Sequence, residues 1–209
     1  ETIGTCEWAR RALRASRRAG SYGAKVALCE FDRVGGTCVL RGCVPKKLLV
    51  YASHVAEELR DAAGFGWTIG AAHHDWPALI AAKDRELDRL NQAYLRMLRE
   101  AGVALHYGRA ELRDAHTVLV HGPDGATQLT AANILIATGS YPIRPPIPGN
   151  EHAVSSNEIL NLPALPRRVV IIGTGYIGVE FACMLHSLGV EVTLMGRGQT
   201  LLRGFDKEA

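Results

Sequence analysis

The sequence predicts an α/β fold in which two units of strand, glycine turn, helix and strand follow one another along 209 residues. Three observations predict it. Apolar runs of strand length alternate with longer segments of helical periodicity, glycines follow an apolar run in each unit, and a proline-rich stretch lies between the units. Such alternation is typical of a parallel sheet that is covered by helices.

The first unit opens with a short strand at residues 3–5, followed by an Arg- and Ala-rich helical stretch. Residues 24–30 form an apolar run that predicts a buried strand, and Gly35 and Gly36 come shortly after it. A helix is expected over residues 43–59, where the glycines have ended and helical periodicity begins.

The middle of the chain changes its period. Residues 64–77, which include three Gly and two His, predict a loop, and residues 76–101 predict a long amphipathic helix. Three strands and one tight turn are expected after this helix, at residues 103–105, 117–120 and 133–136, with the turn at 122–125.

Four prolines between Pro142 and Pro148 break this pattern and predict a linker. After it, residues 168–172 and 190–194 predict two strands that flank a second glycine turn and a helix. We therefore expect a domain boundary near residue 150, with one domain over residues 1–149 and the start of another over 150–209.

Composition excludes several classes of function. A formal charge of +3 without a basic block argues against nucleic acid as a partner, and no apolar run of about 18 residues is present to span a membrane. Five Cys do not form a disulfide framework, so we expect a reducing, cytoplasmic compartment. The first residue is Glu1 rather than Met, which predicts a natural start further upstream.

The strongest chemical signal is the pair Cys38 and Cys43, with four residues between them. Residues five apart in an ideal helix have Cα atoms roughly 8–9 Å apart, whereas a disulfide needs less than about 7 Å. If the pair closes, the first helical turn must be distorted, which Gly42 and Pro45 would permit. Unpaired N–H groups at the helix start would favour a thiolate at Cys43.

Two other interpretations of the pair are open. Cys38 and Cys43 could be buried thiols without chemistry, or half of a zinc site completed by His54, His73 or His74. Zinc sites usually contain a second pair of ligands at similar spacing, which the sequence lacks. The redox interpretation is therefore favoured, with one cysteine attacking a disulfide and the other resolving it.

The flanking residues strengthen this interpretation. Residues 35–47 read GGTCVLRGCVPKK, which resembles the active-site signature of the pyridine nucleotide–disulfide oxidoreductases, class I. The ending Lys46-Lys47 resembles the glutathione reductase branch, since lipoamide dehydrogenases and mercuric reductases usually have Ser-Lys there. The resemblance implies a Rossmann-like, three-layer FAD-binding domain with a β-meander, followed by the start of a Rossmann-like NADPH-binding domain.

The resemblance also implies roles for individual residues. Cys38 would form the mixed disulfide with glutathione, and Cys43 would be the thiolate that lies against the flavin. Thr37, with Gly36 beside it, would contact the flavin. Lys46 would lie near the reactive flavin nitrogen and pair with Glu180.

The second unit contains the motif Gly173-Thr174-Gly175-Tyr176-Ile177-Gly178 between a strand and a helix. In this context the glycines let the backbone approach a pyrophosphate at the helix N-terminus. No acidic residue follows the second strand, where Arg197 and Arg203 appear instead, so a 2′-phosphate and hence NADPH is favoured. The alternatives are an ordinary glycine turn and two solvated surface arginines.

Tyr176 and Glu180 match family positions as well. The resemblance implies that Tyr176 covers the flavin where the nicotinamide docks. Taken on the sequence alone, each could be a partly buried helix residue.

In the first unit Glu30 ends a buried strand and is suitably placed to bind the ribose diol of FAD. Residues 134–139, which end in Thr138-Gly139, resemble the segment that closes the family's FAD domain; a plain strand and turn is the alternative. The N-terminus departs from the family, because only Gly4 remains of its glycines. Cys6, Glu7 and Trp8 would occupy the space of the pyrophosphate, and this departure argues against FAD binding.

The substrate side is basic. Arg17, between Arg14 and Arg18, matches a family position that holds a glutathione carboxylate, and Tyr94 matches a tyrosine beside the bound disulfide. Solvated arginines and core packing of Tyr94 are the alternatives. The basic helix favours anionic glutathione disulfide over the cationic substrate of trypanothione reductase.

Two functions remain. The chain is a fragment of a glutathione-disulfide reductase, or it is an inactive FAD/NAD(P)-binding remnant with an inert dithiol. The family is homodimeric through a C-terminal dimerisation domain that also supplies a catalytic His–Glu pair. We expect that C-terminal half to be absent from these 209 residues.

Overall fold

The computed structural model describes residues 2–5, 10–198 and 200–206. It divides into two compact units, one formed by residues 1–45 and 84–155 and the other by residues 46–83 and 156–209. Both long helices of the chain therefore begin in one unit and end in the other. This division by packing differs from the nucleotide domains expected over 1–149 and 150–209, which stay a prediction.

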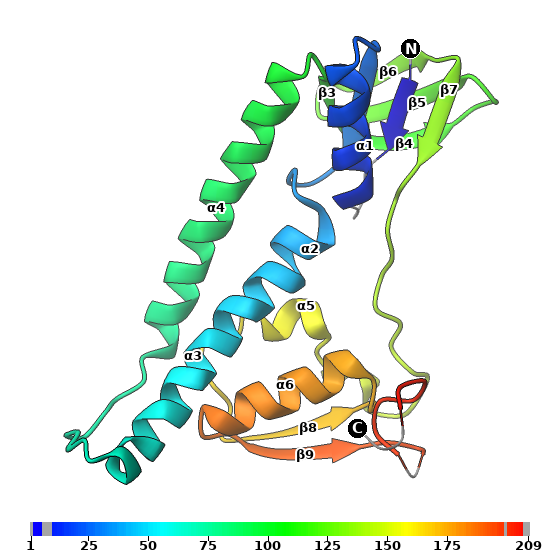
Figure 1. The fold of residues 1–209 in the computed structure, drawn as a ribbon. Coiled ribbons are helices and arrows are strands. Elements are labelled where there is room, and N and C mark those ends of the chain that lie inside the picture. Colours follow the sequence, from blue (N-terminus) through cyan, green and yellow to red (C-terminus); the bar gives the residue numbers. More distant parts are fainter. Residues whose placement is uncertain (1, 6–9, 199, 207–209) are drawn as a thin grey trace. The chain divides into compact units, whose positions relative to one another are not determined.

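The first unit is built on a parallel sheet of four strands in the order β3-β2-β1-β7 (Figure 1). Its strands are β1 (Thr2–Thr5), β2 (Val26–Glu30), β3 (Ala104–Tyr107) and β7 (Asn133–Ile136). All five residues of β2 are buried, as expected for a central parallel strand that is covered on both faces.

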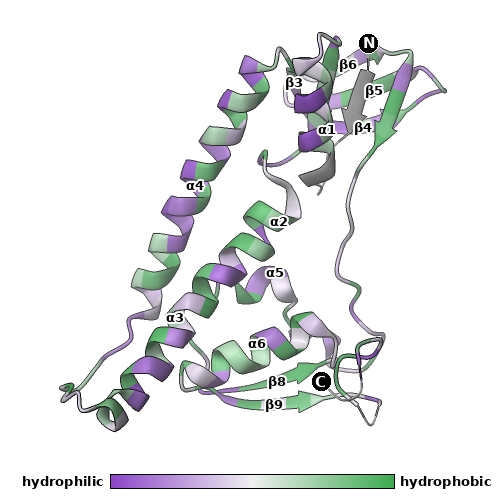
Figure 2. Ribbon diagram, viewed as in Figure 1, coloured by the Kyte–Doolittle hydropathy of each residue, from purple (hydrophilic) through white to green (hydrophobic). Residues whose placement is uncertain are grey.

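Helices cover one face of this sheet. Helix α1 (Arg10–Ser21) and the last turns of α4 (Trp76–Glu100) pack against β2 around Leu13, Leu28 and Leu98. Helix α4 shows apolar and polar colours in turn along its length in Figure 2, as its amphipathic sequence predicts.

An antiparallel meander covers the other face. Its strands are β4 (Arg109–Leu112), β5 (Thr117–Gly122) and β6 (Gly125–Thr130), joined by the turn expected at 122–125. Val118 and Val120 of β5 pack against Ala27 and Cys29, which alternate with the helix-facing residues of β2. Helices, parallel sheet and meander form three layers, and the predicted α/β fold with its β-meander is confirmed.

The segment after β2 contains two helices where one was expected. The short α2 (Gly36–Leu40) ends before α3 (Cys43–Asp61), which runs into the 3-10 turn η1 (Ala62–Phe65). Residues 66–75 lie in a loop, as expected, and residues 141–149 of the proline-rich linker contain no helix or strand.

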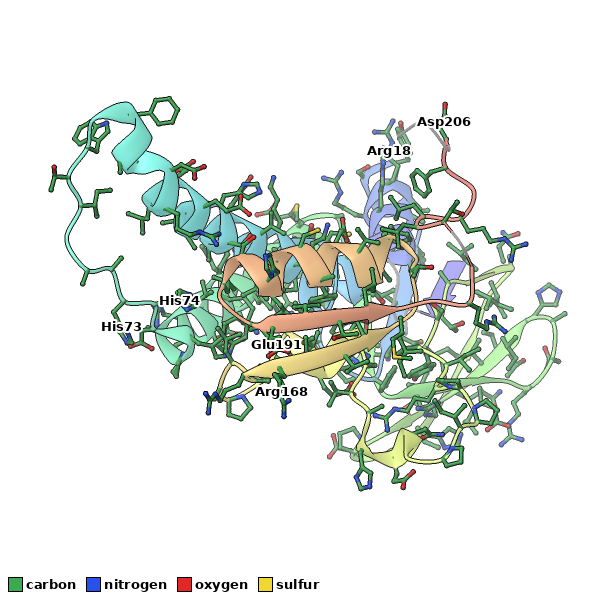
Figure 3. The ribbon with its side chains drawn as sticks, turned by 90° about the horizontal axis from the view of Figure 1, so that it is seen from below. Arg18, His73, His74, Arg168, Glu191 and Asp206 are labelled. Atoms are coloured by element: carbon green, nitrogen blue, oxygen red, sulfur yellow. The ribbon has the colours of Figure 1, made fainter. Side chains whose placement is uncertain are left out.

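The second unit contains a two-stranded parallel sheet, β8 (Arg168–Ile172) and β9 (Glu191–Met195), with α6 (Tyr176–Ser187) lying along it (Figure 1). The strands begin on Arg168 and Glu191, which are partners in the register and are labelled in Figure 3. This strand, turn, helix and strand arrangement is the expected start of a second Rossmann-like fold.

The core of the second unit joins segments that are far apart in the sequence. Leu49 of α3 and Trp76 of α4 pack with Leu160 and Leu185. Trp76 Nε1 donates to the carbonyl oxygen of Leu162 at 2.7 Å, and Lys83 Nζ donates to that of Leu160 at 3.0 Å. The short helix α5 (Ser156–Ile159) and the preceding turn η2 (Asn150–His152) complete the regular elements.

Within the described residues, no helix has the length and apolar character needed to cross a membrane.

Candidate functional site

The two motif cysteines lie on either side of a break between helices. Cys38 is in the middle of α2, and Cys43 is the first residue of α3. Arg41 ends α2 with φ −139° and ψ 16°, and its N–H donates to the carbonyl oxygen of Thr37 at 2.9 Å. The ideal-helix spacing of roughly 8–9 Å between cysteine Cα atoms therefore does not apply here. The distortion needed for a disulfide precedes α3, rather than lying in its first turn.

Gly42 lets this turn fold tightly onto α2. A Cβ atom at position 42 would lie 3.0 Å from the carbonyl oxygen of Thr37 and 3.6 Å from the Cα of Cys38. The residue before Cys43 thus packs directly against the backbone of Cys38. This close approach explains the glycine between the cysteines and brings the two cysteine positions toward one another.

Exposure alone does not decide which thiol attacks. Both cysteines are free thiols in the structure; Cys38 is half-buried and Cys43 is exposed. Cys43 lies at the N-terminus of α3, as expected. The assignment of Cys38 to the mixed disulfide stays a prediction.

Cys29 differs sharply from this pair. It is only 2% exposed, within the core between β2 and the meander. Burial raises the pKa of the Cys29 thiol to about 11, so this cysteine stays protonated and unreactive at neutral pH. Cys183 is exposed on α6.

The zinc interpretation gains no support. No group of three or more Cys, His, Asp or Glu side chains in the described ranges could hold a metal ion. His54 is exposed on α3, and His73 and His74 lie in the loop before α4 (Figure 3). The four-ligand arrangement that a structural zinc requires is not formed by these residues.

Lys46 and Glu180 form the pair that the resemblance implies. Lys46 Nζ donates to Glu180 Oε1 at 2.6 Å, which joins the first turn of α3 to the start of α6. The Lys46 side chain is 27% exposed and that of Glu180 38%, so the pair is only partly screened by solvent. The predicted pairing is confirmed, and the catalytic role of the two residues stays a prediction.

The second glycine turn connects β8 to α6. Gly173 adopts φ +123°, and its N–H donates to the carbonyl oxygen of Met195, which extends the β8–β9 ladder. Gly175 is the N-cap of α6 without a side-chain cap, so the first N–H groups of the helix remain available to an anion. Tyr176 and Ile177 follow it and are exposed.

Gly178 holds the helix against the turn. A Cβ atom at position 178 would lie 2.3 Å from the carbonyl oxygen of Gly173, so no other residue fits without a backbone shift. A Cβ atom at Gly175 would meet nothing within 4 Å. These contrasting environments match a packing glycine and a glycine that leaves space for a pyrophosphate.

The segment after β9 returns to the same turn. The N–H of Leu202 donates to the carbonyl oxygen of Thr174 at 2.9 Å, beside Arg203. Arg197 and Arg203 are both exposed, and the alternative of two solvated arginines stays open. The contact through Thr174 was missed, because nothing in the spacing of the sequence indicates it.

The carboxyl edge of the four-stranded sheet brings the predicted FAD residues together. Gly4 in the central strand β1 is the register partner of Leu28 in β2 and Leu135 in β7. Strand β2 ends at Glu30, and β7 ends shortly before Thr138 and Gly139. Nucleotides bind at this edge in open parallel sheets. Cys6, Glu7 and Trp8, on which the argument against FAD rests, lie outside the described residues.

Glu30 is a buried acid at this edge. Its side chain is 3% exposed, and its Oε1 accepts a hydrogen bond from the N–H of Asp32 at 3.0 Å. Burial and the charge of Glu30 raise the pKa of Tyr107, its register partner in β3. A buried carboxylate at this edge suits a ribose diol, because carboxylate oxygens accept hydrogen bonds from hydroxyl groups.

A cavity of about 350 Å³ lies at the end of β2, lined by Cys29 and Phe31 on either side of Glu30 in the sequence. Its lining residues come from the ends of β2 and β7 and from the meander: Cys29, Phe31, Gly108, Arg109, Ala110, Glu111, His121 and Thr138. Sequence reasoning identified Thr138 and missed Phe31, Arg109 and His121. Phe31 follows β2, whereas Arg109 begins β4 and His121 lies in β5, and no motif in the sequence connects the three. Folding brings the Arg109 guanidinium to 5.1 Å from the Phe31 ring centroid.

The two predicted substrate residues differ in exposure. Arg17 is exposed on α1, whose hydrophilic colour is plain in Figure 2. Tyr94 is half-buried and packs against the core of the first unit, which is the alternative that its sequence left open. Substrate binding by either residue stays a prediction.

Comparison with known proteins places these features in a family. Residues 11–209 match the family pyridine nucleotide-disulphide oxidoreductase. The chain is 52% identical over 196 residues to a glutathione reductase of Nostoc sp. and 47% identical to one of Burkholderia cepacia. It is 45% identical over 206 residues to the chloroplastic/mitochondrial glutathione reductase of Pisum sativum.

Those alignments cover 93–94% of this chain and 42%, 43% and 37% of the three relatives. The chain thus spans less than half the length of the curated relatives it matches. A solved structure, the Cu(II) complex of the HOCl-induced flavoprotein disulfide reductase RclA from Escherichia coli, is 28% identical with a TM-score of 0.84. That similarity covers 99% of this chain and 44% of the other. The match over residues 11–209 shows that the chain belongs to the pyridine nucleotide-disulphide oxidoreductase family.

Proposed function

We propose that this chain is the dithiol-bearing and nucleotide-binding part of an NADPH- and FAD-dependent glutathione-disulfide reductase. The observation that carries the proposal is the break between α2 and α3, which lies between Cys38 and Cys43 and packs Gly42, the residue before Cys43, against the backbone of Cys38. Buried inert thiols need no such break, and the buried Cys29 shows what an inert thiol looks like in this fold.

The chemistry of the pair is thiol–disulfide exchange. The Cys38 thiolate attacks one sulfur of glutathione disulfide, a mixed disulfide forms, and one glutathione thiolate leaves and takes up a proton. Cys43 then attacks the Cys38 sulfur, and the second glutathione leaves as the Cys38–Cys43 bond forms.

The pair must then be reduced again, and bound FAD would supply the two electrons that NADPH provides. Glu30, Thr138 and Gly139 at the carboxyl edge would hold the adenosine half, with Gly36 and Thr37 near the flavin. The hydrogen bond between Lys46 and Glu180 fixes the position of the Lys46 ammonium group. The residues that the structure describes fit the group, while the altered Gly4 segment weakens its pyrophosphate site.

The second unit would bind NADPH. The uncapped N-terminus of α6 and the space beside Gly175 suit a pyrophosphate, and Tyr176 would cover the nicotinamide side. Arg197 and Arg203 suit a 2′-phosphate, and residues 196–205 after β9 include no acid to repel it.

Glutathione disulfide is the proposed substrate, because it is anionic and the exposed face of α1 carries Arg14, Arg17 and Arg18. The names of the curated relatives support this choice over a cationic disulfide. A cytoplasmic location and a homodimeric whole protein are parts of the same proposal and come from the sequence and the family.

An inactive nucleotide-binding remnant is the second candidate, favoured by the loss of glycines after Gly4. The visible absorption of the desalted chain, after incubation with FAD and then with NADPH, separates the two candidates. A reductase retains flavin and gains a long-wavelength charge-transfer band on reduction, and Cys43→Ser loses that band. A colourless chain, or a flavin band that NADPH leaves unchanged, supports the remnant.

A further inference from the structure

Arg41 lies at the break between the two cysteine helices. It is the residue after α2 and precedes Gly42, and its backbone N–H closes the end of α2 on Thr37. None of the nucleotide or thiol chemistry proposed above uses its side chain. The side chain is nevertheless only 27% exposed, so its direction is set by the fold rather than by solvent.

The guanidinium of Arg41 reaches across to the loop after β2. Its Nη2 donates to Asp32 Oδ2 in an ion pair. Asp32 is itself fixed by its N–H, which donates to Oε1 of the buried Glu30 at 3.0 Å. A continuous line of polar contacts therefore connects the cysteine turn to the carboxyl end of β2.

The charges around Arg41 keep this contact in place. Burial lowers the pKa of the Arg41 guanidinium, and the negative charge of Glu30 acts against that effect. Arginine stays protonated at neutral pH in either case. A half-buried ion pair of this kind is screened less by salt than one in open solvent.

Losing this contact would loosen the turn between the two cysteine helices. The chain breaks at Arg41 and Gly42 between α2 and α3, and Pro45 keeps the segment from closing into one regular helix. Without the ion pair to Asp32 the turn is held less firmly, so that the Cα atoms of Cys38 and Cys43 can move further apart. A disulfide then becomes strained, because it needs a Cα separation below about 7 Å.

We propose that Arg41 is a positioning residue for the cysteine pair, which holds the turn to Asp32 and thereby favours the Cys38–Cys43 disulfide over the dithiol. This inference rests on the proposed function, because it assumes that the pair cycles between the two states. In this equilibrium the Cys38 and Cys43 thiols and one glutathione disulfide give the Cys38–Cys43 disulfide and two glutathione thiols.

The equilibrium constant of this exchange tests the proposal. The 209-residue chain is incubated in glutathione buffers of graded ratio and quenched by acid and alkylation, and the fraction with a Cys38–Cys43 disulfide is read by peptide mass spectrometry. We expect Arg41→Leu to lower the constant about tenfold, which is about 30 mV for a two-electron couple. Arg41→Lys should restore part of the loss, because an ammonium pairs with Asp32 without the guanidinium fork.

Matched variants separate positioning from general stability. Arg33→Leu removes the neighbouring ion pair to Asp88, of 2.6 Å and in the same segment, and should leave the equilibrium constant unchanged. Asp32→Asn keeps Arg41 and weakens its partner, and should shift the constant in the same direction as Arg41→Leu but less. Circular dichroism melting of each variant shows whether it is folded.

The outcomes are distinct. Equal constants for the wild type and folded Arg41→Leu or Asp32→Asn overturn the role of Arg41 and leave the proposed function intact. Equal shifts in Arg41→Leu and Arg33→Leu show a general effect of the segment and also overturn it. If Arg41→Leu and Asp32→Asn both fail to fold, Arg41 is a stability residue and the proposal is wrong. A wild-type chain that forms no Cys38–Cys43 disulfide in any buffer contradicts the proposed function and this inference together.

Discussion

Lys46 and Glu180 are joined by a hydrogen bond of 2.6 Å between Nζ and Oε1, across 134 positions of sequence. The bond ties the helix that begins with Cys43 to the helix that begins at the second glycine turn. Lys46, three residues after Cys43, and Glu180, five residues after Gly175, thus orient each other's side chains.

Removing either partner of this pair should lower stability. We expect Lys46→Met and Glu180→Gln each to reduce the free energy of unfolding by about 1 kcal/mol or less, because both groups are partly exposed and the pair is partly screened. The double variant should lose little more than either single one. Urea unfolding measures this, with Glu58→Gln on the exposed side of α3 as the control. Additive losses would show that the two residues do not interact in solution.

The two glycines of the α6 turn should respond differently to alanine. Gly178→Ala places a Cβ atom 2.3 Å from the carbonyl oxygen of Gly173, so we expect a loss of about 1–3 kcal/mol in unfolding free energy. Gly175→Ala meets no atom within 4 Å and should fold normally, but with at least tenfold weaker NADPH binding. Thermal melts and fluorescence titration with NADPH measure the two effects. Normal NADPH affinity in Gly175→Ala would contradict the placement of the pyrophosphate.

Arg197 should set the preference between the two nicotinamide cofactors. Arg197→Ala removes a charge-assisted contact to a 2′-phosphate, so affinity for NADPH should fall about tenfold while affinity for NADH stays the same. Titration with both cofactors gives the ratio. Arg168→Ala is the control, because Arg168 begins β8 and lies at the opposite end of the β8–β9 sheet from Arg197. An equal change for NADPH and NADH would remove Arg197 from 2′-phosphate recognition.

Cys29 should make the fold sensitive to alkaline pH. Its pKa of about 11 in the folded chain lies above the ordinary value of 9.0, so the unfolded chain loses this proton first. The contribution of this proton to the free energy of unfolding is fully present below pH 9. It should fall by about 2 to 3 kcal/mol as pH rises from 9 to 11. Cys29→Ala should flatten this decline in urea unfolding at graded pH. An equally steep decline in the variant would assign it to other groups.

Local patterns in the sequence predicted the elements of the site well. The apolar run before Glu30, the glycines around Gly175 and the helix that begins at Cys43 each produce the expected element, because one segment determines it. The separate helix α2 was missed, since five residues are too few for a periodicity to show.

Contacts between distant segments could not be predicted in the same way. The packing of Leu49 and Trp76 with Leu185 depends on side chains that neither periodicity nor composition connects. It places residues 46–83 with the second unit, although the sequence suggested one uninterrupted first domain. The ion pair of Arg41 with Asp32 likewise depends on a turn that only the folded backbone defines.

The exchange of Cys38 and Cys43 with glutathione disulfide shows whether the two cysteines form a redox-active pair. The reduced chain is exposed to glutathione disulfide, and the products are mapped by peptide mass spectrometry in the wild type, Cys43→Ser and Cys38→Ser. We expect a Cys38–Cys43 disulfide in the wild type and a stable glutathione adduct on Cys38 in Cys43→Ser. A wild-type chain in which both cysteines stay reduced, or carry separate adducts without joining, would contradict it.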